Sequence, residues 1–242
     1  MNPDIGEIWV YLSTTPLLGL TLTLVAYQGA WWLYQRTGQT PLLNPVLIAV
    51  AVLVAVLYAT KTDYETYFDG AQFVHFLLGP ATVALAIPLY AQWQRLRAML
   101  LPLLVTLVAG SLTAALSAVG IAALLGASRE SVMSLAPKSV TTPIAMGIAE
   151  GLGGLPSLTA VLVILTGIVG AVSAKYIYQW LRIEDHAVRG FAIGLASHGI
   201  GTARAFQVSE QAGAFAALAM GLNALITALL LPWVLPRIMA LL

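Results

Sequence analysis

The chain has two places where polar side chains interrupt an apolar stretch, and the first surrounds Lys138. Pro137 and Pro143 bracket this lysine. Each proline lacks a backbone donor and disfavours helical geometry in the residue before it. One helix is therefore predicted to end near 134–136 and the next to begin near 142–143, with the threonine before Pro143 as its N-cap. The hydroxyl residues beside the lysine are Ser139, Thr141 and Thr142.

Lys138 could bind a ligand by its charge. A lysine inside a membrane segment costs about 2.5–3.5 kcal/mol on insertion scales, so it is expected to have a partner or to line a cavity. A cation among hydroxyl groups and helix N-termini suits a small anion. The alternative is that Lys138 lies in a loop and extends its side chain toward the membrane surface.

Enzymatic chemistry is not expected from these residues. A hydrolase with Ser139 as nucleophile and Lys138 as base is disfavoured, because adjacent residues are poorly placed for those two roles. The sequence has no His/Glu metal spacing, no Gly-x-Ser-x-Gly elbow and no phosphate loop. It also has no cysteine, which excludes disulfides and thiolate metal sites. We therefore expect neither an enzyme nor a bound metal or cofactor.

The second polar interruption covers 194–204, where three glycines favour a helix break near 198–202 or a close backbone approach. Backbone groups freed by a break cannot face lipid, so the two breaks are expected to lie together near the middle of the bilayer, where one cavity satisfies both. The candidate binding residues around it are Ser197, His198, Thr202 and Arg204. Arg204 could hold a carboxylate through two parallel hydrogen bonds. His198 could titrate near neutral pH and couple proton movement to transport. The alternative for Arg204 is a structural ion pair with Glu210 or Glu150.

The elements that must position these residues are membrane helices. Of 242 residues, 60% are hydrophobic and 9% are charged, against about 25% charged in an ordinary soluble domain. The net charge of +1 argues against nucleic acid as a partner. The segment Met1–Glu7 is acidic and lacks the basic region of a signal peptide. The first hydrophobic segment is therefore expected to be retained in a multi-pass protein of the lipid bilayer.

Spans of about 20 apolar residues are predicted at Ile8–Leu33, Pro41–Thr60, Ala71–Tyr90, Ala98–Leu125, Leu155–Tyr178 and Gln211–Pro236. Two further apolar segments, Ser131–Gly154 and Ala187–Glu210, contain charge and helix breakers in their middle. The expected fold is an all-α integral membrane protein with about six to eight membrane segments, two of them discontinuous or re-entrant. We expect one polytopic domain, with N-terminal spans at 1–62 and a transport core with an internal inverted repeat at 63–242.

Lysine and arginine in short loops predict the orientation of the spans. An acidic N-terminus favours an outside start, which places Arg95 and Arg97 inside. If Ser131–Gly154 crossed the membrane fully, the basic residues after it would lie outside, and if it returned to its own side they would lie inside. These residues are Lys175, Arg182 and Arg189. The charge rule favours re-entry, and a full crossing by a broken helix is the alternative.

The chain also has a weak internal similarity. Leu78–Val83 resembles Leu135–Val140, and Thr106 and Gly110 match a threonine and a glycine 60 residues later. Chance is one explanation, because apolar helices share few residue types. The other is a transporter built from repeats, in which discontinuous helices meet at a substrate site near the midplane. Both copies of the first match contain a proline where a helix would have to break.

The polar motifs resemble a known family. Leu-Ala-Pro-Lys-Ser-Val-Thr-Thr-Pro-Ile-Ala at 135–145, Leu-Thr-Gly at 165–167 and Ala-Ser-His-Gly-Ile-Gly-Thr-Ala-Arg at 196–204 are similar to the LrgB/CidB family. This family includes YohK-type bacterial inner-membrane proteins and the plastid glycolate/glycerate translocator. The resemblance runs from about Pro41 to the C-terminus and implies a bacterial inner-membrane location.

The resemblance implies two functions. The first is secondary transport of small monocarboxylates such as glycolate, glycerate, lactate or pyruvate, with the carboxylate between the Lys138 stretch and the 198–204 break. The second is antiholin- or holin-like control of murein hydrolase export and lysis, together with a smaller LrgA/CidA-type membrane partner. The family is also distantly similar to cation/proton antiporters and bile-acid symporters, which have broken helices and inverted repeats. A homodimer is left open.

Overall fold

The computed structural model describes residues 16–240. This part of the chain is helical and contains no strand, so the predicted all-α class is confirmed. It divides into two compact units, one ending at Ala84 and one beginning at Leu85. Among the described residues, the segments long and apolar enough to cross a membrane are Tyr64–Ala91, Leu100–Leu124, Pro156–Trp180 and Glu210–Met239. The predicted arrangement of the chain as one polytopic domain stays a prediction.

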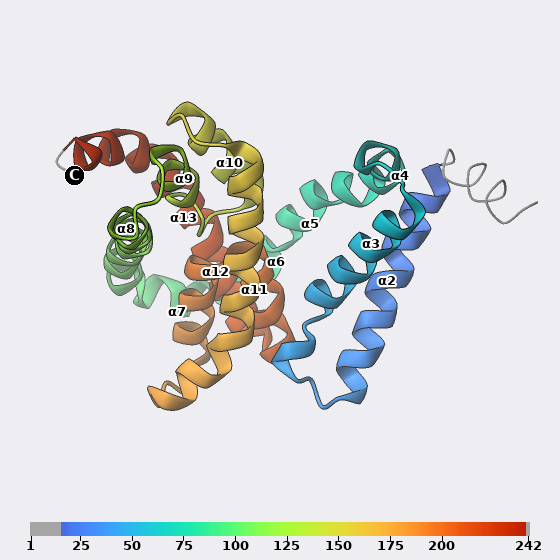
Figure 1. Ribbon diagram of the computed structural model, residues 1–242. Helices are drawn as coiled ribbons and strands as arrows, with labels where there is room; N and C mark the ends of the chain where they lie inside the picture. The colour runs from blue at the N-terminus through green and yellow to red at the C-terminus, as the bar shows by residue number, and fades with distance from the viewer. Residues whose placement is uncertain (1–15, 241–242) are drawn as a thin grey trace, which may run out of the picture. The chain divides into compact units, whose positions relative to one another are not determined.

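The first unit contains α2 (Pro16–Arg36), η1 (Pro41–Leu43), α3 (Pro45–Thr60), α4 (Tyr64–Phe76) and α5 (Leu78–Ala84). In Figure 1, α2 and α3 lie side by side. Gly19 allows α2 to approach the backbone of α4 at Tyr67, and the Tyr67 hydroxyl is 2.7 Å from that of Thr23. The predicted span Pro41–Thr60 is helical in η1 and α3, but α3 is a shorter apolar helix of 16 residues, so its crossing of the membrane stays a prediction. The predicted span Ile8–Leu33 lies partly outside the described residues.

The predicted span Ala71–Tyr90 is helical but not continuous. It falls into α4, α5 and α6 (Ala86–Ala91), which are separated at Leu77 and Leu85. Pro80 and Pro88 follow each separation by three residues. A proline cannot donate to the carbonyl four residues before it and its ring presses on that carbonyl, so each proline interrupts the helix one turn earlier.

The second unit holds the two polar motifs. It contains α6, α7 (Trp93–Ala98), α8 (Leu100–Leu124), α9 (Arg129–Leu135), α10 (Thr142–Gly151), α11 (Pro156–Trp180), α12 (His186–Val208) and α13 (Glu210–Met239). The spans predicted at Ala98–Leu125, Leu155–Tyr178 and Gln211–Pro236 agree with α8, α11 and α13. The helix α10 lies beside α11 (Figure 1).

The helix α12 is bent back on itself. Its first turns lie against the start of α13, because a Cβ at Gly190 would be 2.8 Å from the Cα of Ala212. Its last turns also lie against the start of α13, since the Phe206 side chain occupies the space beside Gly213. The two halves also meet each other, because a Cβ at Gly201 would be 2.6 Å from the carbonyl oxygen of Ile193. We call this element the second hairpin, with arms at 186–196 and 199–208.

Both ends of the second hairpin contact one short stretch of the chain. Arg95 forms an ion pair with Asp185, the N-cap of α12. Gln211, at the start of α13, donates to the Gln92 side chain at 3.3 Å. The backbone N–H of Val188 holds the pKa of the Asp185 carboxyl below its ordinary value, with smaller effects of the same sign from the next backbone donor and from the arginine. The second hairpin therefore begins and ends at one face of the unit, the Arg95 face.

The proposed sequence repeat is not seen as a repeated conformation. Leu78–Ala84 is the helix α5, whereas Pro137–Val140 of the other copy forms turns between two helices. In the second match, Gly110 and Gly170 both face the second hairpin, because Gly110 lies against the Leu195 side chain and Gly170 against Ser197. Gly110 on α8 and Gly170 on α11 therefore both leave space for side chains of the second hairpin.

Candidate functional site

The first helix break lies between α9 and α10. The helix α9 ends at Leu135 and α10 begins at Thr142, which confirms the predicted ends of both helices. In the gap, the Lys138 N–H donates to the Leu135 carbonyl at 3.1 Å and the Val140 N–H donates to the Pro137 carbonyl at 3.2 Å. The N-cap is Thr141, which has extended geometry, and not Thr142 as predicted, because Thr142 already forms part of the helix. We call α9, this gap and α10 the first hairpin.

The first hairpin begins and ends away from the Arg95 face. The helix α8 starts at Leu100, just after Arg95, and the chain returns to Arg95 when α11 ends before Asp185. The end of α8 and the start of α11 must therefore share the opposite face. The N–H of Leu155 donates to the Ser134 hydroxyl at 2.8 Å, which fastens the arm α9 to the start of α11. The two hairpins thus enter the unit from opposite faces.

The second helix break lies at Ser197 and His198, the tip of the second hairpin. Ser197 has φ −131° and ψ 17°, and His198 has φ 41° and ψ −133°. The prediction put this break near 198–202 and attributed it to the glycines. The break begins one residue earlier, and Gly199 and Gly201 are both helical. Close packing requires glycine at Gly201, where a Cβ would be 2.6 Å from the Ile193 carbonyl oxygen, but not at Gly199, where it would meet only the Met220 sulfur at 3.9 Å. A positive φ at a histidine is costly, and such outliers cluster at functional sites.

Asn223 of α13 joins the two breaks. Its Nδ2 donates to the carbonyl oxygen of Ser139 at 3.2 Å and to that of Leu195 at 3.0 Å. Its Oδ1 accepts from the Thr227 hydroxyl at 3.3 Å and from the Ser111 hydroxyl at 2.5 Å, whose single hydrogen is shared with the Leu107 carbonyl at 2.7 Å. Both carbonyls belong to residues at the breaks, where the regular helical donors are missing. The two breaks therefore lie together, as the sequence predicted, although about 60 residues separate them.

His198 fixes the tip of the second hairpin to the middle of α11. Its Nε2 is 3.0 Å from the carbonyl oxygen of Val163. A carbonyl can only accept, so Nε2 carries the hydrogen. Gly167 makes room for the ring, because a Cβ there would be 2.8 Å from the His198 Cε1. Within the described residues, Nδ1 has no hydrogen-bond partner, so the ring keeps one nitrogen available to a ligand.

Four predicted residues lie in the first hairpin beside this tip. Lys138 is half-buried, its Nζ donates to the Ser139 hydroxyl at 3.3 Å, and it is close enough to His198 for the two to interact electrostatically. The hydroxyls of Thr141 and Thr142 are half-buried and, in the described part of the chain, make no hydrogen bond. The structure therefore brings Lys138, Ser139, Thr141, Thr142 and His198 into one region.

The other predicted residues have different positions. Ser197 is buried, with its side chain against Gly170. The Thr202 hydroxyl donates to the carbonyl of His198 at 2.8 Å, within its own arm. Arg204 donates to Gln207 at 3.1 Å, and it lies six residues beyond His198, about 9 Å along a helix. Thr202 thus stabilises the tip, and Arg204 lies nearer the Arg95 face.

Three buried polar residues at the site were not predicted from the sequence: Asn223, Ser111 and Thr227. Asn223 is an amide in the middle of a predicted span, between Leu222 and Ala224. Polar side chains in membrane helices form hydrogen bonds between helices, so this pattern was a usable signal. The two hydroxyl residues gave no such signal, because a serine or threonine can bond to its own helix.

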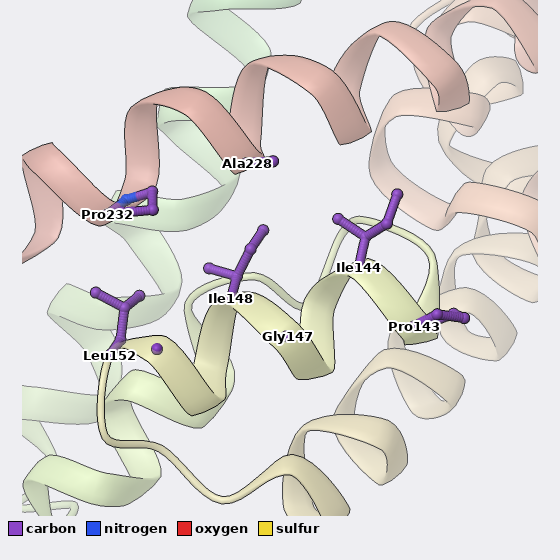
Figure 2. Close-up of a pocket in the computed structure, with 8 residues that line it drawn as sticks. Pro143, Ile144, Gly147, Ile148, Leu152, Ala228 and Pro232 are labelled. Carbon is purple, nitrogen blue, oxygen red and sulfur yellow. The ribbon is translucent and has the colours of Figure 1, made fainter.

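Two hollows beside the breaks differ in size and chemistry. A groove of about 380 Å³ lies between α10 and α13. Figure 2 shows Ile144 and Ile148 of α10, and Leu152 just after it, facing Ala228 and Pro232 of α13. Its lining has no charge and no hydroxyl, so it does not suit an anion. A cavity of about 10 Å³ is lined by four polar residues, Ser111, Ser139, Asn223 and Thr227, together with apolar neighbours, and it has room for about one water molecule.

Comparison with known proteins identifies the family. The model of the LrgB-like family matches residues 23–236. The protein named "Uncharacterized protein YwbG" from Bacillus subtilis (strain 168) is 37% identical over 219 residues, which cover 90% of this chain and 97% of the relative. "Antiholin-like protein LrgB" from Bacillus cereus (strain B4264) is 28% identical over 226 residues, which cover 93% and 98%. No solved structure matches the chain. The chain therefore belongs to the LrgB-like family, as its motifs predicted.

Proposed function

We propose that this protein is a membrane transporter of small monocarboxylates, such as glycolate, glycerate, lactate or pyruvate. The observation that carries the proposal is the meeting of the two breaks at Asn223, beside the half-buried Lys138. Broken helices that meet in the middle of a membrane protein are the usual place for a transported substrate, because they offer backbone groups and helix ends in a wet cavity. This site offers a cation and hydroxyls, which suit a carboxylate.

The arrangement of the hairpins supports this proposal. Each arm of the second hairpin has ten or eleven residues (186–196 and 199–208), which is about 15 Å and half of a bilayer core. The tips meet Ser111, Val163 and Asn223, which lie well inside α8, α11 and α13. We infer that both hairpins are re-entrant, that they enter from opposite sides and that their tips meet near the midplane.

The order of the elements supports an inverted repeat. The first hairpin is followed by the span α11, and the second hairpin is followed by the span α13 with the opposite direction. We propose that this pair, rather than the match between Leu78–Val83 and Leu135–Val140, is the inverted repeat of the fold. The Arg95 face carries four arginines, Arg95, Arg97, Arg182 and Arg189, against two near the opposite face, Arg129 and Arg237. The positive-inside rule therefore turns the Arg95 face to the cytoplasm of a bacterial inner membrane.

The substrate would bind by its carboxylate. In our proposal Lys138 supplies the charge, and the free hydroxyls of Thr141 and Thr142 donate to the carboxylate oxygens. They stand at the N-terminus of α10, where the helix dipole also favours an anion. The free Nδ1 of His198 would accept a hydrogen bond from the other end of the substrate. Arg204 is left out of this contact because it lies about two turns away along its helix.

A second candidate function is favoured by the name "Antiholin-like protein LrgB" of a relative. In this alternative the protein regulates murein hydrolase export and lysis together with a smaller LrgA-type membrane partner. A regulator that acts through a pore needs a channel formed between chains. The site described above lies within one chain, and for this reason we place transport first.

The test is uptake of labelled glycolate and pyruvate by proteoliposomes that contain the purified protein. We expect saturable uptake of at least one of the two acids and no uptake of the neutral glycolamide, because the site recognises a charge. A holin-like pore would pass the amide and the acids alike, without saturation. Absence of any saturable carboxylate uptake would exclude the transport proposal for these substrates.

The variant Lys138→Ala links uptake to the site. Loss of one partner of a buried charge pair costs about 2 kcal/mol or more, so uptake at low substrate concentration should fall at least about 30-fold. Lys175→Ala is the matched control, since Lys175 is an exposed lysine of α11 and its loss should change uptake less than about twofold. Normal uptake by well-expressed Lys138→Ala would show that the substrate binds elsewhere.

A further inference from the structure

Asn223 is the residue through which the two hairpin tips are connected. A side-chain amide has two donor hydrogens and two acceptor lone pairs. In Asn223 the donors go to the carbonyls of Ser139 and Leu195, and the acceptor takes the hydroxyls of Ser111 and Thr227. Both donors and the acceptor oxygen are therefore bonded within the protein, and the residue is 1% exposed. Asn223 has no group left with which to contact a substrate.

The bonds of Asn223 join parts of the chain that are otherwise separate. Ser139 belongs to the first hairpin and Leu195 to the second, and both carbonyl oxygens lie within 3.2 Å of one nitrogen atom. The hydroxyl of Ser111 on α8 holds the oxygen end of the amide. The amide plane is thus fixed from one side, so that its two hydrogens point at the two tips.

We infer that Asn223 is a positioning residue that ties the two hairpin tips together and holds Lys138 and His198 on opposite sides of one site. Its part in transport rests on the proposed function, whereas the tie itself does not. A carrier that opens alternately to the two faces must move one hairpin relative to the other. One of the two bonds of Asn223 would then break in each half of the cycle, so that a single residue couples both movements.

The test is hydrogen–deuterium exchange of the purified protein in lipid nanodiscs, without substrate. For Asn223→Ala we expect exchange to rise at least about tenfold at both tips, in peptides that cover 136–142 and 195–202, because both lose a bond to the same residue. The matched control is Asn44→Ala, since Asn44 is also a buried asparagine but its side chain, within residues 16–240, bonds only to the start of its own helix, at Val46 and Leu47. It should leave both tips unchanged.

The variant Ser111→Ala covers the case in which Asn223→Ala fails to fold. It keeps both donors of Asn223 and removes one of the two hydroxyls that orient its amide. We expect a smaller rise, about two- to fivefold, again at both tips. A rise at one tip alone, or at neither, in the variant that folds would overturn the tie.

An uptake measurement separates this inference from the proposed function. With Asn223→Ala we expect the KM for the carboxylate to rise at least about tenfold, because the two sides of the site are no longer held in register. If both tips loosen but the unmodified protein carries no carboxylate, the tie stands and the transport proposal fails. If carboxylate is carried and the tips do not loosen, transport stands and the tie fails.

Discussion

The close packing of the second hairpin on α13 leads to a prediction about Gly194. This residue lies one turn before the tip, and a Cβ there would be 2.6 Å from the Cα of Ala216. Ordinary contacts of this kind begin near 3.4 Å, and the added Cβ would be closer still to the Ala216 carbonyl oxygen, so Gly194→Ala requires α12 and α13 to separate by at least about 0.8 Å. The obstacle is backbone and not a side chain that could rotate away. Such overpacking costs about 1–3 kcal/mol, of which better helix propensity returns at most about 1 kcal/mol.

The measurement is unfolding in mixed dodecyl maltoside and SDS micelles, followed by circular dichroism at increasing SDS fraction. The control is Gly147→Ala in α10, where a new Cβ would meet no atom within 4 Å. Gly147→Ala should be neutral or slightly stabilising, and Gly194→Ala should be less stable than it by about 1–3 kcal/mol. Equal unfolding midpoints for the two variants would refute the reasoning that glycine is required for this contact.

Two further predictions concern stability. The pKa of Asp185 is lower in the folded protein than its ordinary value of 3.8, so the stabilisation by its carboxylate is complete above that value and is lost as the pH falls through the folded-state pKa. The thermal midpoint of the unmodified protein should therefore fall with decreasing pH, and that of Asp185→Asn should fall less. Parallel curves for the two proteins would contradict this. Ser134→Ala leaves the N–H of Leu155 without its acceptor and should cost about 1–3 kcal/mol. The control is Ser117→Ala on the exposed side of α8, whose free energy of unfolding in SDS should stay within about 0.5 kcal/mol of the unmodified protein. An equal loss of stability in both serine variants would count against the bond between Leu155 and Ser134.

The prolines and the charge made the first helix break predictable from the sequence. Pro137 and Pro143 act on the residues next to them, so the end of α9 at Leu135 and the start of α10 at Thr142 followed from local geometry alone. The long spans were equally predictable, because length and hydropathy are properties of contiguous residues. Local rules failed where two were in competition, as at Ala71–Tyr90, whose hydropathy fits one span while two prolines divide the helix.

The second break shows what the tertiary structure decided. The glycines at 199 and 201 predicted the region of the second break, yet the non-helical residues are Ser197 and His198. Glycine permits a turn, but the position of the turn depends on which backbone can lie against α11 and α13. Gly190, Gly194 and the other small residues are used for that contact, so the turn falls on a histidine that Val163 holds in place.

The sequence by itself determined that this is a helical membrane protein of the LrgB-like family with two interrupted segments. It also suggested that the interruptions would lie together, from the cost of unsatisfied backbone groups in lipid. Only the tertiary structure decided that one asparagine side chain bonds to backbone carbonyls at both breaks. It also decided that the Thr202 hydroxyl bonds within its own hairpin and that Arg204 lies apart from Lys138. The physical reason is range: hydropathy and proline geometry act within a few residues, whereas the partner of Ser139 lies 84 residues further along the chain.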